Sequence, residues 1–277
     1  MATTTRKDLR RMVGRHFPLE QYRLLAATAN GTTTSFIDTE RLQGPDNAYR
    51  GALLYFAGGA NLGTYRHVQS SSQSAAQLTW GTPATSTVAG DEAELWNLRG
   101  EGVDPVQVNE AINDAIANLA KNAWIPVNGN VAAAFDQTVA TVAVPAALTR
   151  GMYGVDYQDR VDTARWIEVD GGGEDPTVGW WYDRANAVVA VGGWWRTFLD
   201  AATLRIRGYG GTAALAADTD ATPIDAEAIV TEVVRLLVMT NAVKNPDLDR
   251  YLQATGGEGA AKRSFATGRP SPNTIVF

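Results

Sequence analysis

The sequence predicts an α+β protein built from two β-rich modules, each barrel- or sandwich-like, with a helical base of two main helices and extended termini. Two regions, Leu24 to Leu98 and Ala132 to Tyr209, carry short strand patterns punctuated by Gly, Asn, Asp and Ser, which is typical of small barrels and sandwiches. Each region is followed by a segment whose apolar residues recur at helical spacing. No internal repeat relates the two regions.

Composition excludes several classes of function. The 277 residues are 45% apolar and 19% charged, enough for one large or two modest domains. Cysteine is absent, which excludes disulfides and thiolate metal sites, and two histidines, His16 and His67, argue against a multi-histidine metal site. The net charge of −6 argues against general affinity for nucleic acid. No segment resembles a membrane span or a secretory signal, so we expect a soluble protein. We also expect no metal and no cofactor.

The N-terminal part is predicted to be an arm over residues 1–23, followed by an accessory β-module over 24–100. Residues Thr5 to Phe17 favour a short basic helix with Leu9, Met12 and Val13 on one side. The strands expected in the module are, in order, Thr32–Ile37, Leu53–Phe56, Tyr65–Gln69, Gln77–Trp80 and Glu94–Leu98. A turn over Ser70 to Ser74 is expected between the third and the fourth.

Residues 101–255 are predicted to form the core domain, which begins with a well-marked helix. Asp104 is a favoured N-cap, Pro105 suits the first helical position, and Gln107 stands where a capping box requires Glu or Gln. Pro126 stops this helix near Trp124, because the residue before a proline avoids helical geometry.

The rest of the core domain is a tryptophan-rich β-region and a second helix. The expected strands are Val139 with Val142–Val144, Arg165–Val169, Trp180–Tyr182, Ala187–Val191 and Leu204–Arg207, with turns at Gly171–Gly173 and Gly192–Gly193. A helix is expected from Thr222 or Asp225 to about Asn245, and Pro246 blocks its continuation. Residues 256–277 lack periodicity and are predicted to form an extended C-terminal arm.

The order of these pieces carries a family resemblance. TTTSFIDTERL, NAYRGALLYFAGG and TYRHVQSSSQSAAQLTW precede the helix VNEAINDAIANLAKNAWIPV, and LRIRGYGG and DTDATPIDAEAIVTEVVRLLV follow the Trp-rich strands. From about Leu24 to Met239 this order resembles the head-to-tail adaptor proteins of tailed bacteriophages. The resemblance implies a virion structural protein without enzymatic activity, assembled in the host cytoplasm. It also implies a ring, usually of twelve copies, between the portal protein and a tail or nozzle protein.

The same resemblance implies a central channel through which DNA passes. An acidic ring suits such a conduit, because a basic lining would retain the duplex through counterion release. The C-terminal arm is the predicted partner-seeking element, since an extended segment can add a strand to a neighbouring sheet. Its predicted interface residues are four apolar anchors and three basic residues: Phe265, Ile275, Val276 and Phe277, with Lys262, Arg263 and Arg269.

Tryptophans supply the alternative interpretation, a carbohydrate-binding module of a phage tail or secreted protein. Strand alternation would send the indoles of each adjacent pair, Trp180–Trp181 and Trp194–Trp195, to opposite faces. We favour subunit contact for the exposed members and assign Trp181 and Trp195 to it, because tryptophan is enriched in interfaces. Trp166 belongs to the same aromatic set.

Several charged groups have a catalytic or binding interpretation beside a structural one. Asp218 and Asp220 have the D-x-D spacing of a cation site, but loop solvation and helix-start electrostatics are favoured. The pairs Glu92/Glu94 and Glu168/Asp170 resemble glycosidase carboxylates, a weaker third option that makes the protein a glycoside hydrolase. His16 and His67 are expected to be surface or hydrogen-bonded residues. The basic run is interpreted equally as a partner site or as a solvated helix face: Arg6, Lys7, Arg10, Arg11 and Arg15.

Overall fold

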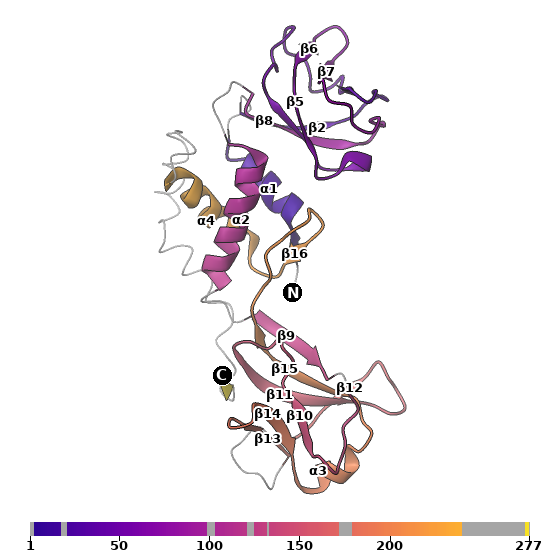
Figure 1. Ribbon diagram of the computed structural model, residues 1–277, viewed down its shortest axis with the longest axis vertical. Helices are drawn as coiled ribbons and strands as arrows, with labels where there is room; N and C mark the ends of the chain where they lie inside the picture. The colour runs from indigo at the N-terminus through magenta and orange to yellow at the C-terminus, as the bar shows by residue number, and fades with distance from the viewer. Residues whose placement is uncertain are drawn as a thin grey trace. The chain divides into compact units, whose positions relative to one another are not determined.

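A computed structural model describes residues 3–17, 21–98, 103–120, 125–131, 133–171, 179–239 and 275–276 (Figure 1). The chain forms two compact units, Met1–Lys121 with Ala213–Phe265, and Asn122–Thr212 with Ala266–Phe277. Helices are mixed with several antiparallel sheets, in agreement with the α+β prediction. This division groups the two long helices with the first β-region, whereas the sequence suggested grouping them with the second. No described helix is both long and apolar enough to cross a membrane.

Among its described residues, the first unit combines two larger antiparallel sheets and a two-stranded one with three α-helices and one short 3-10 helix. The sheet orders are β2-β8-β4-β5 and β3-β7-β6, and β1 pairs with β16. The elements are β1 (Thr4–Thr5), α1 (Arg6–Gly14), β2 (Tyr22–Ala26), β3 (Ser35–Ile37), β4 (Leu53–Phe56), η1 (Gly59–Asn61), β5 (Tyr65–His67), β6 (Ser70–Ser72), β7 (Gln77–Thr79), β8 (Glu92–Trp96), α2 (Pro105–Ala120), β16 (Ala221–Thr222) and α4 (Ala226–Met239).

Alternation along the four-stranded sheet separates two environments. One face supplies Leu25, Leu54 and Leu95 to an apolar core that also holds Phe36 and Leu78 from the other sheet. Residues of the opposite phase are buried too, although they are polar or aromatic, and they face α1: Tyr22, Tyr55, Glu94 and Trp96. The sheet is therefore covered on both faces, which positions the site described below.

Local signals predicted several of these elements correctly. β4 has the predicted bounds, and β5, β7 and β8 lie within two residues of theirs. The predicted Ser70–Ser74 turn is wrong in part, because Ser70–Ser72 is strand β6 paired with β7. Of the predicted strand from Thr32, only Ser35–Ile37 is a strand; the Thr32 hydroxyl and backbone instead bond to Ser35 and Thr34. β2 was not predicted.

Side-chain caps fix where the two long helices begin. The Asp104 carboxylate accepts from the Val106 N–H at 2.7 Å, and the Gln107 side chain accepts from the Asp104 N–H at 3.2 Å, which is the predicted capping box. Asp225 caps α4 through the Ala228 N–H. The helices α2 and α4 pack on one another and both contact α1, as Figure 1 shows. The base thus has a third member, because α1 belongs to it and is no free arm.

Where the structure describes it, the second unit holds two antiparallel sheets with orders β12-β11-β15-β9 and β10-β14-β13, and β17 also pairs with β11. Its core contains Met152, Val155, Trp180, Leu204 and Ile206. The elements are β9 (Ile125–Asn130), β10 (Thr141–Ala143), β11 (Gly151–Gln158), β12 (Trp166–Glu168), β13 (Trp180–Asp183), β14 (Val188–Val191), α3 (Gly193–Phe198), β15 (Leu204–Gly210) and β17 (Ile275–Val276).

The strands that the pattern predicted are present as β10 and β12 to β15, except that Val139, predicted to belong to the first of them, lies in the turn before β10. Three elements differ from prediction. β11, at eight residues the longest described strand, was not predicted, and neither was β9. The expected turn at Gly192–Gly193 is instead the start of α3, where Gly193 has a φ of +59°. A helix follows because Trp194, Trp195 and Phe198 pack their rings together at helical spacing.

Candidate functional site

The basic residues of α1 form the densest charged cluster among the described residues of the first unit. α1 begins after Thr5, whose hydroxyl caps the Asp8 N–H, and β1 pairs with β16, so the helix start is held against the segment that precedes α4. Backbone bonds reinforce this: the Arg6 N–H donates to the Asp220 carbonyl and the Lys7 N–H to the Asp218 carbonyl. The N-terminal helix is thereby fixed next to the Asp218 loop.

Arg10 lies at the centre of the cluster and has no exposed surface. Its guanidinium binds two carboxylates in a bidentate manner: Glu94 of β8 at 2.7 and 3.2 Å, and Asp218 at 2.8 and 2.8 Å. Asn109 of α2 accepts a further bond at 3.1 Å, and the guanidinium lies 4.1 Å from the Tyr55 ring centre. A single side chain thus joins α1, β4, β8, α2 and the loop before α4.

The two carboxylates have further donors. Asp218 accepts from Tyr55 Oη at 3.1 Å and from Arg6 Nε at 3.1 Å, and Glu94 accepts from the indole of Trp96 at 3.1 Å. Saturating buried carboxylates in this way avoids the large cost of an unpaired buried charge. We call Arg10, Glu94, Asp218, Arg6 and Tyr55 the buried network.

A more exposed pair of contacts borders the buried network. Glu92 accepts from Arg11 at 2.7 Å and from Lys7 at 3.3 Å, while Arg11 Nε lies 3.7 Å from Glu94. The Glu92 side chain is 41% exposed and that of Lys7 31%, so solvent weakens this pair. The geometry of α1 explains why two of its cations bind Glu92 and two bind Asp218. Positions 7 and 11 share one side of the helix, and positions 6 and 10 share another.

Electrostatics follow from this geometry. Burial raises the pKa of Asp218, but the hydrogen bonds and charges of Arg10 and Arg6 outweigh it, so the pKa lies below its ordinary value. Desolvation alone would lower the pKa of Arg10, yet Asp218 and Glu94 raise it. Burial raises the pKa of Tyr55 and of Tyr22. The arrangement keeps Asp218 charged and the two phenols neutral, which suits a structural network better than acid–base chemistry.

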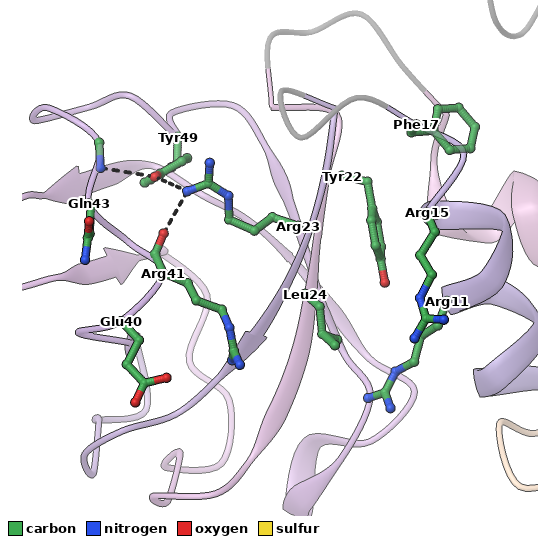
Figure 2. A pocket seen from close by; sticks show the side chains of 12 residues that line it. Arg11, Arg15, Phe17, Tyr22, Arg23, Leu24, Glu40, Arg41, Gln43 and Tyr49 are labelled. Carbon is green, nitrogen blue, oxygen red and sulfur yellow. Dashed lines mark hydrogen bonds between the residues drawn. The ribbon is translucent and has the colours of Figure 1, made fainter. Parts of the chain in front are cut away.

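A cavity of about 780 Å³ opens beside this network, between the end of α1, β2 and the loop after β3. Figure 2 shows Arg11, Arg15 and Tyr22 on its helix side and Arg23 with Tyr49 on its loop side. Four arginines and one carboxylate contribute to the lining, which is strongly cationic for an acidic chain. The lining residues are Arg11, Gly14, Arg15, Phe17, Tyr22, Arg23, Leu24, Glu40, Arg41, Gln43, Gly44 and Tyr49.

The arginines of this cavity differ in how they are held. Arg23 donates to the Arg41 carbonyl and to Tyr49 Oη, both at 2.7 Å, and Arg41 lies 3.6 Å from the buried Asp38 carboxylate. The exposed Arg15 guanidinium has no hydrogen bond or ion pair with any residue that the structure describes. Chemically, the cavity can receive an anionic group at Arg15 and an apolar one against Tyr22 and Leu24.

Four of the five residues of the basic run are therefore neither a free partner site nor a solvated face. Arg6, Lys7, Arg10 and Arg11 are occupied by carboxylates of the same chain, and Arg15 alone of the five remains available within the described part. His67 is exposed on β5, where its ring contacts Tyr65. His16 is partly buried, and burial lowers its pKa.

The carboxylate pairs are likewise engaged by structure. Asp220 accepts the Ala216 and Ala217 N–H groups, each at 2.7 Å, while Asp218 lies in the buried network, so the D-x-D motif does not present two ligands to a cation. Glu92 and Glu94 face arginines. In the second unit, Glu168 pairs with Arg207 at 2.5 Å, and Asp170 is exposed.

The tryptophans of the second unit have mixed roles. Trp180 is buried and Trp181 is half-buried, as alternation on β13 predicts. The assignment of Trp195 to an exposed interface is wrong: Trp195 is 7% exposed, and Trp194 is 63% exposed. The reason is that both lie on α3, where their indoles stack at 4.1 Å instead of alternating across a strand. Trp166 is half-buried beneath the Arg205 guanidinium, 4.4 Å from the ring centre.

The predicted C-terminal arm is described only at Ile275 and Val276, which form β17 against β11. The other five interface residues lie outside the described residues: Lys262, Arg263, Phe265, Arg269 and Phe277. The buried network was not predicted, although the sequence carries a signal for it. Glu94 lies in the apolar strand AELW and Arg10 lies beside Leu9, and such placements favour a buried ion pair.

No protein-family model matches the chain, and a search of curated proteins finds no match.

Proposed function

We propose that this protein is a structural head-to-tail adaptor of a tailed bacteriophage. In this proposal, copies form a ring between the portal and a tail or nozzle protein and keep a passage open for DNA. The chain is not an enzyme, and its place is the neck of the virion. The β-rich modules are proposed to be barrel- or sandwich-like.

The observation that carries the proposal is the use of the chain's charged groups. In the described part of the first unit, the buried carboxylates and arginines hold α1, β8 and the Asp218 loop together. A protein whose work is mechanical needs such cross-links between elements, whereas an enzyme needs polar groups that converge on a substrate. The resemblance from Leu24 to Met239 gives this structural role its specific form.

The arginine-lined cavity supports a docking role. Its aromatic and apolar walls, combined with the available Arg15 guanidinium, suit a partner segment that carries a carboxylate next to an apolar side chain. We propose that a portal or tail protein supplies this segment. An Arg15→Glu variant should weaken that docking at least tenfold without a loss of thermal stability, because Arg15 is exposed.

The direct test is electron microscopy of the purified chain, alone and mixed with a cognate portal protein. Rings, or a complex with the portal, are the expected result. A chain that stays monomeric and ignores the portal at all concentrations would contradict the proposal. A second test concerns the DNA passage. Tight, salt-sensitive binding of duplex DNA by the isolated protein would also count against the proposed function.

One observation favours the alternative, a carbohydrate-binding module. The exposed Trp194 indole stacks on Trp195 and meets the exposed Phe198 ring edge-on, 5.2 Å away, which gives an exposed aromatic cluster. Retention of the monomer on a glycan array, lost in Trp194→Ala, would favour this alternative. Wild-type binding to the portal with no glycan retention would favour the adaptor.

A further inference from the structure

One edge of β11 is covered by two segments that are far apart in the sequence. β12 pairs with Asp156 to Gln158, and the Val169 N–H adds a bond to the Val155 carbonyl. The chain then leaves this edge, because Gly171 already packs against the backbone of Trp180 in β13. β17 covers the other end of the same edge, where it pairs with Gly151 and Met152.

This second position on the edge requires an occupant. Gly151 and Met152 are buried, with Met152 fully so. A buried backbone N–H or C=O without a partner costs free energy, and an uncovered strand edge invites pairing with another chain. The occupant in the single chain is its own end, which is joined to α4 through residues 240–274.

We propose that β17 is exchanged between copies, so that the last strand of one subunit completes the β11 edge of the next. This inference rests on the proposed adaptor function, since a ring supplies the neighbours. The hydrogen bonds of the exchanged strand are the same as those within one chain, so exchange is a low-cost route to assembly. A connection as long as residues 240–274 can reach roughly 100 Å when extended, more than the width of a domain.

Charge favours a neighbour as the acceptor. The segment 256–277 carries Lys262, Arg263 and Arg269 against Glu258, so its net charge is three minus one, or +2, in a chain of net −6. Acidic bodies repel one another, and a basic tail that crosses from one body to the next offsets this repulsion. Because donor and acceptor surfaces differ, the exchange is head-to-tail, which is the kind of contact that closes rings.

The absence of cysteine from the chain allows a direct test. Met152 and Ile275 are opposite one another in the β11–β17 register. Opposed antiparallel residues lie about 4.5–5.5 Å apart between Cα atoms, within the disulfide range. Full-length Met152→Cys and full-length Ile275→Cys proteins are mixed under mild oxidation and run on a non-reducing gel. Exchange predicts a disulfide-linked species of doubled mass that forms in the mixture and not with either variant alone.

A matched control uses Glu168→Cys in place of Met152→Cys. Residue 168 lies on the same sheet edge and its side chain is 64% exposed, so it is the more reactive partner for random collisions. Exchange predicts at least fivefold less cross-linked dimer for this pair. Equal yields from both pairs would overturn the proposal, and so would a mixture that stays monomeric up to the solubility limit.

A second measurement needs no substitution in the core. A chain truncated after Pro270 has an open β11 edge, and it should form a one-to-one complex with the intact chain in sedimentation velocity but not with itself. If both assays give only monomers, exchange is wrong. Rings that bind the portal without cross-linking between subunits would overturn exchange and leave the adaptor function standing. Copies that cross-link but do not bind the portal would support strand exchange and contradict the adaptor function.

Discussion

At the scale of single residues, Arg10 is the residue on which the first unit depends most. Arg10→Met removes the guanidinium but leaves Glu94 and Asp218 buried without their main partner. Breaking a buried ion pair by removing one member costs about 3–5 kcal/mol. We therefore expect Arg10→Met to lower the free energy of unfolding by about this amount in urea titrations.

Lys7→Met is the matched control, since it removes a cation from the same helix. Lys7 binds Glu92 at 3.3 Å with both side chains partly exposed, so its loss should cost less than about 1 kcal/mol. Equal losses from the two substitutions would show that Arg10 is not buried among its carboxylates.

Asp218 gives the first unit a dependence on pH. Its pKa in the folded state is lowered, because Arg10 and Arg6 outweigh the opposing effect of burial. A lowered pKa contributes stability that is fully present above the unfolded value, about 3.9, and is lost as the pH falls through the folded value. Unfolding free energies measured from about pH 6 down to about pH 2 should rise less steeply with pH in Asp218→Asn than in wild type. Parallel slopes would contradict this linkage.

At the scale of elements, Gly14 shows how α1 fits against β2. A Cβ at this position would lie 2.6 Å from Cζ of Tyr22, whose ring is buried and 4.5 Å from that of Trp96. Gly14→Ala should therefore destabilise by about 1–3 kcal/mol through overpacking, despite the better helix propensity of alanine. Gly211→Ala is the control, because its Cβ would meet its nearest atom, on Thr149, at an ordinary 3.6 Å. Thermal melts that rank the two variants in the opposite order would refute this packing.

The two ends of the chain differ in how much they contribute to stability. α1 was predicted to be part of an arm, yet its contacts with β8, α2 and α4 make it a part of the first unit. Deleting residues 1–14 should abolish cooperative unfolding of the first unit. Deleting 271–277 should leave unfolding cooperative and lower the melting temperature of the second unit only modestly, because it removes the two-residue pairing of β17 with β11. Circular dichroism melts of the two truncated chains measure the difference, and equal behaviour would contradict it.

Elements also show what sequence reasoning can reach. The start of α2 was predictable because its capping box uses residues within one helical turn. β11 was not, since Gly151 and Gly154 interrupt its apolar pattern and pairing on both edges defines it. The buried network lies further beyond local reasoning, because Arg10 meets partners 84 and 208 positions away in the sequence.

At the scale of the whole molecule, the second unit is largely an insertion in the first. The chain leaves the first unit after Lys121 and returns at Ala213, and each unit has an apolar core of its own. The proposed adaptor role would benefit from this arrangement, because a partner could load one unit without loosening the apolar core of the other.

Independent cores predict two separable unfolding transitions. Arg10→Met should lower one of them, and Ile206→Ala, which opens a cavity at a fully buried position of the second core, should lower the other by about 2–5 kcal/mol. Differential scanning calorimetry of the two variants and the wild type distinguishes the transitions, and the double variant should show both shifts added, since the sites share no partner. If either substitution moves a single common transition, the cores unfold together and the units are not independent.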